Sequence, residues 1–336
     1  MAYIKAMAYS LPETRLTNED LYPRFGEKAV KSITKMAGIT ERRVTAPGET
    51  ALSLATQAAL KLFEEHGCDP KSIDLLIFVS QTGDYQVPAN ACILHERLGL
   101  RENCACFDIN QGCSAFPYGL SVANSMLETG VASRALLINA DVVTQLLYPK
   151  DRALVTLHGD AAVATLLDCS APGGKLCGFH LGTDGTGWRH IQIPCCGADR
   201  QRNGVAGEEI VTEAGSVATN KHLQMDGPAV FHFSLYKVPE AIQQALTKWH
   251  WTVDDCALVL LHQANKTMVE MIYRALNVPA EKQFYFMEKV GNVAGASSPL
   301  LLSQALRQGK IKSGDKLLLA AFGNGLSWGA VAIEWT

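Results

Sequence analysis

Cys113 is the residue of this sequence best placed to act as a nucleophile. It follows the turn-forming run Asn110–Gly112 and precedes apolar residues that recur at helical spacing from Phe116 to Leu127. It therefore lies at or just before a predicted helix N-terminus, where exposed amides and the helix dipole favour a thiolate. We expect the pKa of this thiol to lie below the ordinary value of about 8.5. The alternative is a small buried hydrophobic residue, which most free cysteines are.

An imidazole and a carboxamide in the second half of the chain could complete a site around the thiol. His262 follows the apolar run Leu258–Leu261, and a helix is predicted from Asn265, so the ring stands where α/β folds place ligands. Asn292 lies among the small residues 291–298, and its amide can donate to an oxyanion without carrying a charge. The plainer alternatives are a hydrogen-bonded core histidine and an asparagine in a turn.

Composition excludes several classes of protein. The chain has 336 residues, a net charge of −3 and 48% hydrophobic residues, enough for one large domain or two ordinary ones. We expect no nucleic-acid partner, because no Lys/Arg-rich block occurs. No apolar run reaches the roughly 18 residues that span a membrane, and the first residues lack the order of a signal peptide. These features predict a cytoplasmic protein.

The ten cysteines do not form a recognisable metal or disulfide pattern. The close pairs are Cys104 with Cys106 and Cys195 with Cys196, and neither has zinc spacing. We interpret them as reduced structural thiols. The Gly-rich run 182–187 lacks the phosphate-binding pattern and is interpreted as a turn. The sequence thus predicts no metal and no cofactor.

Strand-like and helix-like segments alternate along the chain. Buried strands are predicted at 73–79, 134–140, 161–167, 257–261, 317–321 and 330–334, and helices at 51–66 (after a Thr50 cap), 88–98, 114–129 and 230–248. This alternation predicts an α/β fold with a mainly parallel sheet. A break near residues 170–174 separates two halves, 1–174 and 175–336, which match only as coarse patterns.

The order Cys, His, Asn along the chain is also that of papain-type peptidases. That family has a Cys-Gly-Ser/Ala-Cys-Trp/Tyr run near the mature N-terminus. Here Cys113 lies deep in the chain and is followed by Ser114–Phe116. The sequence therefore argues against a peptidase.

Six segments together resemble β-ketoacyl-acyl-carrier-protein synthase III. They are Asp108–Phe116, His262–Asn265, Val290–Asn292, Ala321–Gly329, Gly38–Arg43 and His158–Ala162, in family order. The resemblance runs from about residue 3 to residue 335. It implies a thiolase-like fold, in which two similar halves form a five-layered α-β-α-β-α core, and a homodimer.

The resemblance also implies a reaction. Cys113 would take an acyl group from a thioester, and the backbone amides of Cys113 and Asn324 would form the oxyanion hole. His262 and Asn292 would bind the carbonyl of a malonyl thioester and stabilise the enolate formed as carbon dioxide leaves. Two neutral donors suit an enolate oxygen because they are preorganised without a counter-charge. The carbanion would then attack the acyl-cysteine.

The chain departs from the family at several positions. Asn324 stands where most relatives have a small residue. Relatives primed by coenzyme A hold adenine between a Trp and an Arg. By the resemblance, this chain has Ser32 at the Trp position and Met36 at a nearby family arginine, although Arg152 matches the other clamp arginine. An acyl-carrier protein or another thioester could therefore deliver the first acyl group in place of coenzyme A. Val87 stands where a Phe often reaches the partner subunit's acyl pocket, and the smaller side chain would admit a bulkier acyl group.

Three basic residues of the second half could contact a partner protein. Lys266, Arg274 and Lys289 are candidates to meet an acidic carrier protein, although ordinary solvated charge explains them equally well.

The alternative function is an acyltransferase on the same fold, which would pass the acyl group to an alcohol or amine with His262 as general base. A catalytically idle subunit is a third possibility, against which the complete Cys, His and Asn set argues.

Overall fold

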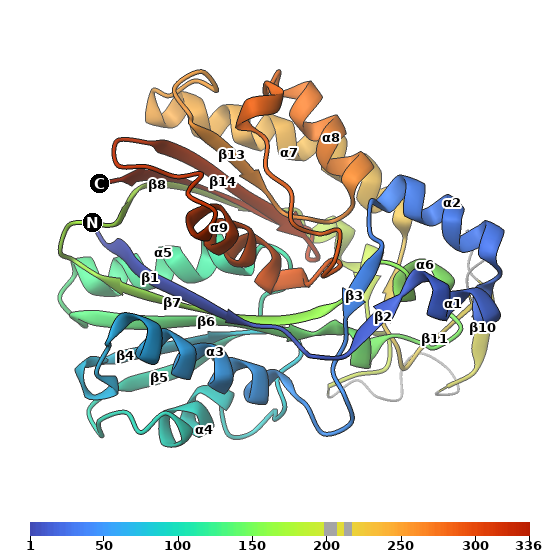
Figure 1. Ribbon diagram of the computed structural model, residues 1–336, viewed down its shortest axis with the longest axis horizontal. Helices are drawn as coiled ribbons and strands as arrows, with labels where there is room; N and C mark the ends of the chain where they lie inside the picture. The colour runs from blue at the N-terminus through green and yellow to red at the C-terminus, as the bar shows by residue number, and fades with distance from the viewer. Residues whose placement is uncertain (198–206, 212–216) are drawn as a thin grey trace.

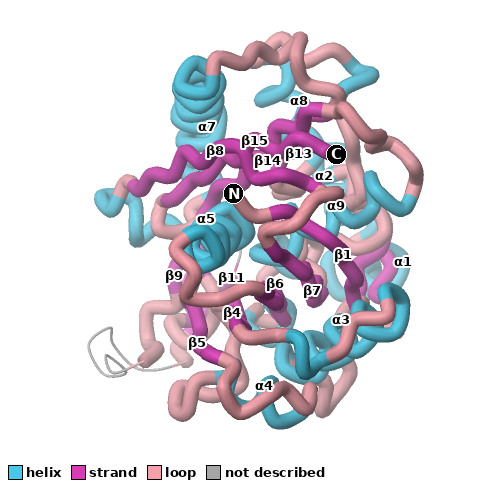
Figure 2. The backbone as a smooth tube through the Cα atoms, turned by 90° about the vertical axis from the view of Figure 1, so that its left-hand side faces the viewer, coloured by secondary structure: helices cyan, strands magenta, loops and turns pink. Residues whose placement is uncertain are grey.

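The computed structural model describes residues 1–197, 207–211 and 217–336, and nine strands within these ranges form one hydrogen-bonded sheet. Its order is β13-β14-β15-β8-β1-β7-β6-β4-β5. The bounds are β1 Tyr3–Ser10, β4 Leu75–Val79, β5 Ala105–Ile109, β6 Arg134–Val142, β7 Asp160–Asp168, β8 Gly174–Thr183, β13 Leu258–Leu261, β14 Lys316–Gly323 and β15 Ser327–Trp335. Only two residue pairs join β1 to β8, so the sheet divides there into two layers (Figure 2).

Helices cover and separate these two sheet layers (Figure 1). Helices α3 (Ala51–His66) and α4 (Asn90–Arg97) pack on the outer face of the first layer. Helices α5 (Ala115–Glu128) and α9 (Ser297–Arg307) lie between the layers and contact both. Helices α7 (Gly227–Trp249) and α8 (Lys266–Ala275) cover the second layer. The predicted five-layered α-β-α-β-α arrangement is therefore confirmed.

The two halves repeat one topology. In the first half the strand order is β4-β6-β7-β1, and in the second it is β13-β14-β15-β8, with the same relative strand directions. Helix α5 precedes β6 as α9 precedes β14, so the two central helices occupy equivalent places. A division of the halves at residues 174 and 175 stays a prediction.

The prediction of a mainly parallel sheet is wrong. Three of the eight strand pairings are parallel, namely β4 with β5, β4 with β6, and β13 with β14. The link from β14 to β15 shows one reason, because it spans only residues 324–326 and a parallel crossover needs a dozen or more. These two strands therefore form a buried antiparallel hairpin.

The five helices predicted from local sequence signals form close to the expected positions, as α3, α4, α5, α7 and α8. Thr50 caps α3 by accepting the Ser53 amide, and Gly67 ends the helix in the left-handed conformation. The remaining elements are α1 Asn18–Phe25, α2 Glu27–Ala37, α6 Arg152–Val155, β2 Arg15–Thr17, β3 Glu41–Arg43, β9 Ile191–Gln192, β10 Glu209–Val211, β11 Val217–Thr219 and β12 Gln224–Met225. They lie beside the layers, on the side where α1 and α2 are seen in Figure 1.

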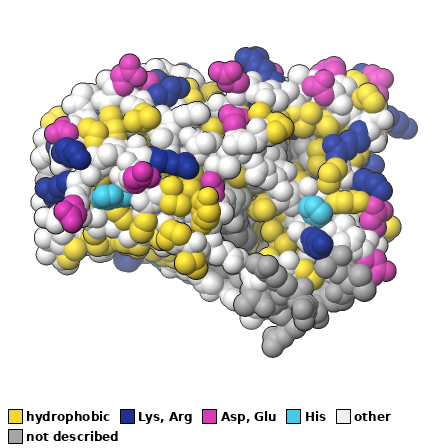
Figure 3. Space-filling model, turned by 90° about the horizontal axis from the view of Figure 1, so that it is seen from below, with side chains coloured by type: hydrophobic (Ala, Val, Ile, Leu, Met, Phe, Trp, Pro, Cys, Tyr) yellow, Lys and Arg dark blue, Asp and Glu magenta, His cyan; other side chains and the backbone are white. Residues whose placement is uncertain are grey.

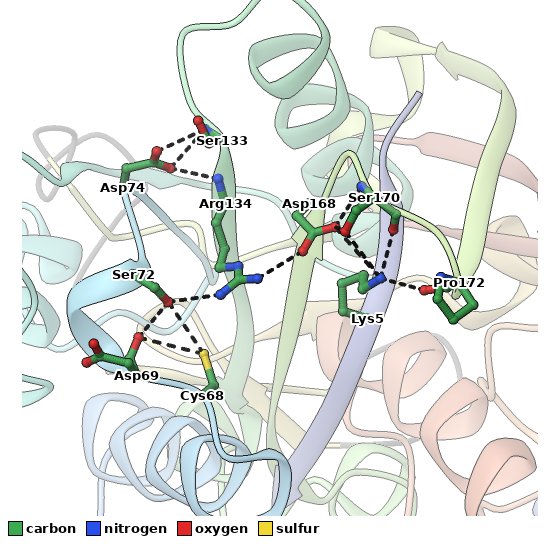
Figure 4. Close-up of polar contacts among 10 residues, drawn as sticks. All are labelled: Lys5, Cys68, Asp69, Ser72, Asp74, Ser133, Arg134, Asp168, Ser170 and Pro172. Carbon is green, nitrogen blue, oxygen red and sulfur yellow. Dashed lines mark hydrogen bonds and ion pairs between the residues drawn. The ribbon is translucent and has the colours of Figure 1, made fainter.

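A polar network fastens one end of the first sheet layer (Figure 4). Arg134, the first residue of β6, binds Asp168 of β7 at 3.2 Å and the Ser72 hydroxyl at 3.2 Å. Lys5 of β1 donates to the Ser170 carbonyl at 2.7 Å. Because β4, β5 and β6 run parallel, this end lies opposite the end at which the chain leaves β5 for Cys113. The network therefore stabilises the sheet without approaching the thiol.

The surface carries charges of both signs. On the face seen in Figure 3, Lys and Arg side chains alternate with Asp and Glu, and hydrophobic side chains lie between them. This mixture agrees with the net charge of −3. Among the described residues, none of the helices has the length and apolar character needed to cross a membrane.

Candidate active site

The three side chains predicted from the sequence line one cavity. It has a volume of about 450 Å³, and Cys113, His262 and Asn292 all contribute to its wall. Most of the other described lining residues are apolar, among them Val143, Ile191 and Leu223. The structure thus brings a thiol from the first half together with an imidazole and a carboxamide from the second.

Cys113 stands on the short loop between β5 and α5. Helix α5 begins at Ala115 with Ser114 as its N-cap, and the Ala115 amide donates to the Gly112 carbonyl at 2.8 Å. The predicted position just before a helix N-terminus is confirmed. The predicted lowering of the thiol pKa is wrong. Burial, and to a smaller extent the nearby Asp141 carboxylate, raise the pKa of Cys113 to about 12, although the backbone amides of Asn324 and Cys113 act to lower it.

A second backbone segment packs directly on the thiol. A Cβ atom on Gly323 would lie 2.5 Å from the Cβ of Cys113 and 2.8 Å from its sulfur, so only glycine fits there. The backbone amides of Cys113 and Asn324 both lower the pKa of the thiol, which places both donors at the sulfur. The backbone at Asn324 is held by Ser327, whose hydroxyl donates to the Asn324 carbonyl at 2.7 Å.

The Asn324 side chain is accommodated by a specific neighbour. Its Nδ2 donates to Oε1 of Gln81 at 2.9 Å, and the carboxamides of both residues lie directly against Gly112. A Cβ atom on Gly112 would lie 2.2 Å from Oδ1 of Asn324 and 2.5 Å from Oε1 of Gln81. The larger residue at position 324 is therefore matched by Gln81 and by the absence of a side chain at position 112.

His262 is held at the end of β13 as a neutral ring. Its amide donates to the Ala320 carbonyl at 2.8 Å, and the ring packs edge-on against Phe322 with the centroids 5.6 Å apart. Burial, and to a smaller extent the neighbouring His158, lower the pKa of His262 to about 3. Nδ1 of His262 is buried without a hydrogen-bond partner among the described residues.

Asn292 is fixed by its own backbone and by its side-chain oxygen. Its amide donates to the Leu157 carbonyl at 2.8 Å, and its carbonyl accepts from the Gly159 amide at 3.1 Å. Its Oδ1 accepts from the Ala294 amide at 3.0 Å. The side-chain oxygen is thus engaged by the backbone, and Nδ2 is left as the donor that a ligand in the cavity can use.

Sequence reasoning missed three residues of this site. His158 and Gln81 line the cavity, and buried Asp141 joins two of its walls by accepting from the Gln81 amide at 3.0 Å and the Gly295 amide at 2.8 Å. Burial lowers the pKa of His158 to about 4 and raises that of Asp141 to about 7. Two signals were available, since His158 lies in a motif segment and Asp141 directly follows the predicted strand 134–140.

Three other predicted residues lie outside this cavity wall. Among its described lining residues none is Val87, Arg152 or Lys266. Val87 is 85% exposed on the loop before α4, Arg152 is half-buried at the start of α6, and exposed Lys266 lies 3.8 Å from Glu270 on α8. Met36, at the position where the resemblance implies an arginine, does line the cavity.

The cysteines and the possible metal-ligand side chains form neither disulfides nor a metal site in the described part of the chain. None of the ten cysteines, which all lie within the described residues, forms a disulfide. Across residues 1–197, 207–211 and 217–336, no group of three His, Cys, Asp or Glu side chains is arranged to hold a metal ion.

We predict that replacing Gly323 by Ala destabilises the protein by about 1–3 kcal/mol, because the added methyl group would overlap the Cys113 side chain. The free energy of unfolding in urea measures the effect. Gly185→Ala is the matched control, since a Cβ atom there meets no atom within 4 Å. Equal stability of the two variants would contradict the close packing described here.

We also predict that His158 and His262 stay neutral down to about pH 5, below the ordinary histidine pKa of about 6.5. Burial lowers the pKa of both rings, to about 4 and about 3. The Cε1–H resonances, assigned with single His→Asn variants, should not shift between about pH 8 and about pH 5. Since the unfolded chain takes up these protons near pH 6.5, the stability that neutral rings contribute should fall as pH drops below that value.

Comparisons with known proteins agree with the family resemblance seen in the sequence. Residues 107–185 match the family 3-Oxoacyl-[acyl-carrier-protein (ACP)] synthase III, and residues 246–335 match its C-terminal family. The chain is 34% identical to a beta-ketoacyl-[acyl-carrier-protein] synthase III of Caldanaerobacter subterraneus subsp. tengcongensis, over 97% of this chain and 95% of that one. It is 36% identical to the Trichodesmium erythraeum protein of the same name, over 97% and 96% of the two chains.

Solved structures give the same result. A crystal structure of a 3-oxoacyl-(acyl-carrier-protein) synthase III superposes with a TM-score of 0.95 at 34% identity, covering 99% of both chains. The priming beta-ketosynthase of the R1128 polyketide biosynthetic pathway superposes with a TM-score of 0.87 at 27% identity, covering 99% of this chain and 96% of that one. This chain therefore belongs to the 3-oxoacyl-acyl-carrier-protein synthase III family.

Proposed function

We propose that this protein is a condensing enzyme that joins an acyl group to a malonyl thioester with loss of carbon dioxide. The observation that carries the proposal is the single cavity lined by Cys113, His262 and Asn292. The relatives support it, because they are named beta-ketoacyl-acyl-carrier-protein synthase III and one similar structure is a priming ketosynthase.

In the first step the sulfur of Cys113 attacks the carbonyl carbon of an acyl thioester. The carbonyl electrons move to oxygen, and the backbone amides of Cys113 and Asn324 donate to this oxyanion. Collapse of the tetrahedral intermediate forms the acyl–cysteine thioester and breaks the bond to the leaving sulfur. The thiol proton leaves with that sulfur.

In the second step a malonyl thioester occupies the cavity. His262 and Nδ2 of Asn292 donate to its thioester carbonyl, and the bond to the carboxylate breaks to release carbon dioxide. The electron pair forms an enolate, whose carbon attacks the acyl–cysteine carbonyl. The bond from that carbonyl carbon to the Cys113 sulfur then breaks, and the sulfur takes up one proton from water to restore the thiol. Both donors are neutral in the structure, since burial keeps the pKa of His262 at about 3. They therefore stabilise the enolate by preorganisation.

An acyltransferase on the same fold has less support. It would pass the acyl group to an alcohol or amine without decarboxylation, and the family to which the chain belongs is named for synthases. An idle subunit is also less supported, because the cavity contains all three reactive side chains.

We further propose that a carrier protein supplies the first acyl group. Ile33 and Met36 line the cavity from α2, and Met36 is 50% exposed, so an apolar side chain stands where the resemblance would place an arginine. Ser32 is exposed and offers no aromatic face. The exposed cations Lys266, Arg274 and Lys289 on α8 and the 289 loop are the candidates to meet the acidic carrier protein.

We also propose that the protein is a cytoplasmic homodimer. Strand β5 ends the sheet, so one of its edges has no partner strand among the described residues. Val87 and Tyr85 expose 85% and 54% of their surface on the loop before α4, which is unusual for apolar side chains of that size. Val87 would then contact the partner subunit near its acyl cavity.

The reaction can be tested by mass spectrometry of the intact protein. An acyl-carrier-protein donor alone should add one acyl group to Cys113, and malonyl carrier protein should then release carbon dioxide and a carbon–carbon bonded product. Cys113→Ala should accept no acyl group, whereas the exposed-cysteine control Cys92→Ala should be acylated normally. Asn292→Ala should still be acylated but condense on the order of 100-fold more slowly. Absence of any adduct with every donor would falsify the proposal.

The assembly can be tested by light scattering after size exclusion. We expect twice the mass of one chain. Val87→Asp should weaken the dimer, because it places a charge in an apolar interface. Val131→Asp is the control, since Val131 is also exposed, at 66%, but follows α5. A wild-type monomer, or equal behaviour of both variants, would disprove this assembly.

A further inference from the structure

His158 lines the cavity, yet neither step of the proposed reaction uses it. Among the described lining residues the titratable side chains are those of Cys113, His158 and His262. His158 is only 7% exposed and lies between α6 and β7, in the first half of the fold. A buried imidazole beside a reaction centre needs a structural reason, because burial of a polar ring is costly unless it is hydrogen-bonded.

The reason lies in the backbone of Asn292. Residues 157–159 pair with the segment around Asn292 as a short parallel bridge. The Asn292 amide donates to the Leu157 carbonyl at 2.8 Å, and the Gly159 amide donates to the Asn292 carbonyl at 3.1 Å. Nδ1 of His158 lies 3.2 Å from the same carbonyl oxygen. The oxygen thus receives one backbone donor and one side-chain donor from the opposite half.

This contact fixes the tautomer of His158. A carbonyl oxygen can only accept, so Nδ1 must carry the hydrogen. The ring is neutral at physiological pH, because burial lowers its pKa to about 4, and Nε2 therefore carries a lone pair. The contact is close-packed as well, since a Cβ atom on Gly159 would lie 2.0 Å from the Val290 carbonyl oxygen.

We propose that His158 is a positioning residue for Asn292, whose carboxamide it holds in place through the Nδ1–H bond to the Asn292 carbonyl. Asn292 is then anchored at its amide, its carbonyl and its Oδ1, and Nδ2 is the polar atom left to meet the malonyl thioester. This inference rests on the proposed condensation. It assigns His158 to the second step only, because Cys113 and its two amide donors lie on other segments.

Two substitutions separate the hydrogen bond from the bulk of the ring. His158→Asn places a side-chain N–H near the position of Nδ1 and keeps a donor for the Asn292 carbonyl. His158→Phe keeps the ring and loses the donor. We expect the Phe variant to lose about tenfold in kcat for condensation, while acylation of Cys113 without malonyl stays within about twofold of wild type. The Asn variant should retain most of the condensation rate.

Several results would overturn the inference. Wild-type condensation by the Phe variant is one, and equal losses in acylation and condensation are another, because they would indicate a general structural defect. Equal losses in the Phe and Asn variants would show that the hydrogen bond is not what matters.

A measurement without turnover keeps the inference separate from the proposed function. The side-chain amide signals of Asn292 in ¹⁵N NMR, assigned by their loss in Asn292→Ala, should broaden or shift in His158→Phe and stay near wild type in His158→Asn. Unchanged signals in both variants would refute the positioning role even if the enzyme proved inactive. Failure of the wild-type protein to condense would instead count against the proposed reaction.

Discussion

Close approach of the glycine backbone in one half to atoms of the other half is the constraint on which this site depends. The Gly323–Asn324 peptide lies so near Cys113 that a single methyl group at Gly323 would overlap the thiol side chain. On the other side of the cavity, Gly159 meets the Val290 carbonyl at a distance that excludes any side chain. Both contacts join a segment of the first half to a segment of the second. Glycine at these positions therefore lets the two halves share one cavity.

The repeated topology explains why the halves meet there. Helices α5 and α9 occupy equivalent places between the sheet layers, and each begins next to the cavity. Cys113 precedes α5, while Asn292 and the turn at 294–296 precede α9. One geometric position thus carries a nucleophile in one half and a hydrogen-bond donor in the other. The two halves therefore share one topology but carry different functional groups at equivalent positions.

The sequence predicted the parts of this structure that are local. Cys113 was found from a helix start, His262 from a strand end and Asn292 from a run of small residues, and all three line the cavity. The layered fold followed from the family resemblance. Residues that act through distant contacts were missed, such as Asp141, whose carboxylate accepts amides from residues 81 and 295. Strand direction was misjudged because alternation of strands and helices does not distinguish a crossover from a hairpin.

The error in the Cys113 pKa shows which physical effect dominates. A helix N-terminus stabilises an adjacent anion by up to about 2 kcal/mol in favourable geometry, roughly 1.5 pKa units. Burial and the Asp141 carboxylate outweigh this, since they raise the pKa of the thiol to about 12. The resting site therefore does not stabilise the thiolate form of Cys113. The amides of Cys113 and Asn324 serve instead to receive the charge when it moves to the substrate oxygen. In the proposed reaction negative charge forms on the substrate oxygen only as the sulfur attacks, and these two amides are already positioned to donate to it.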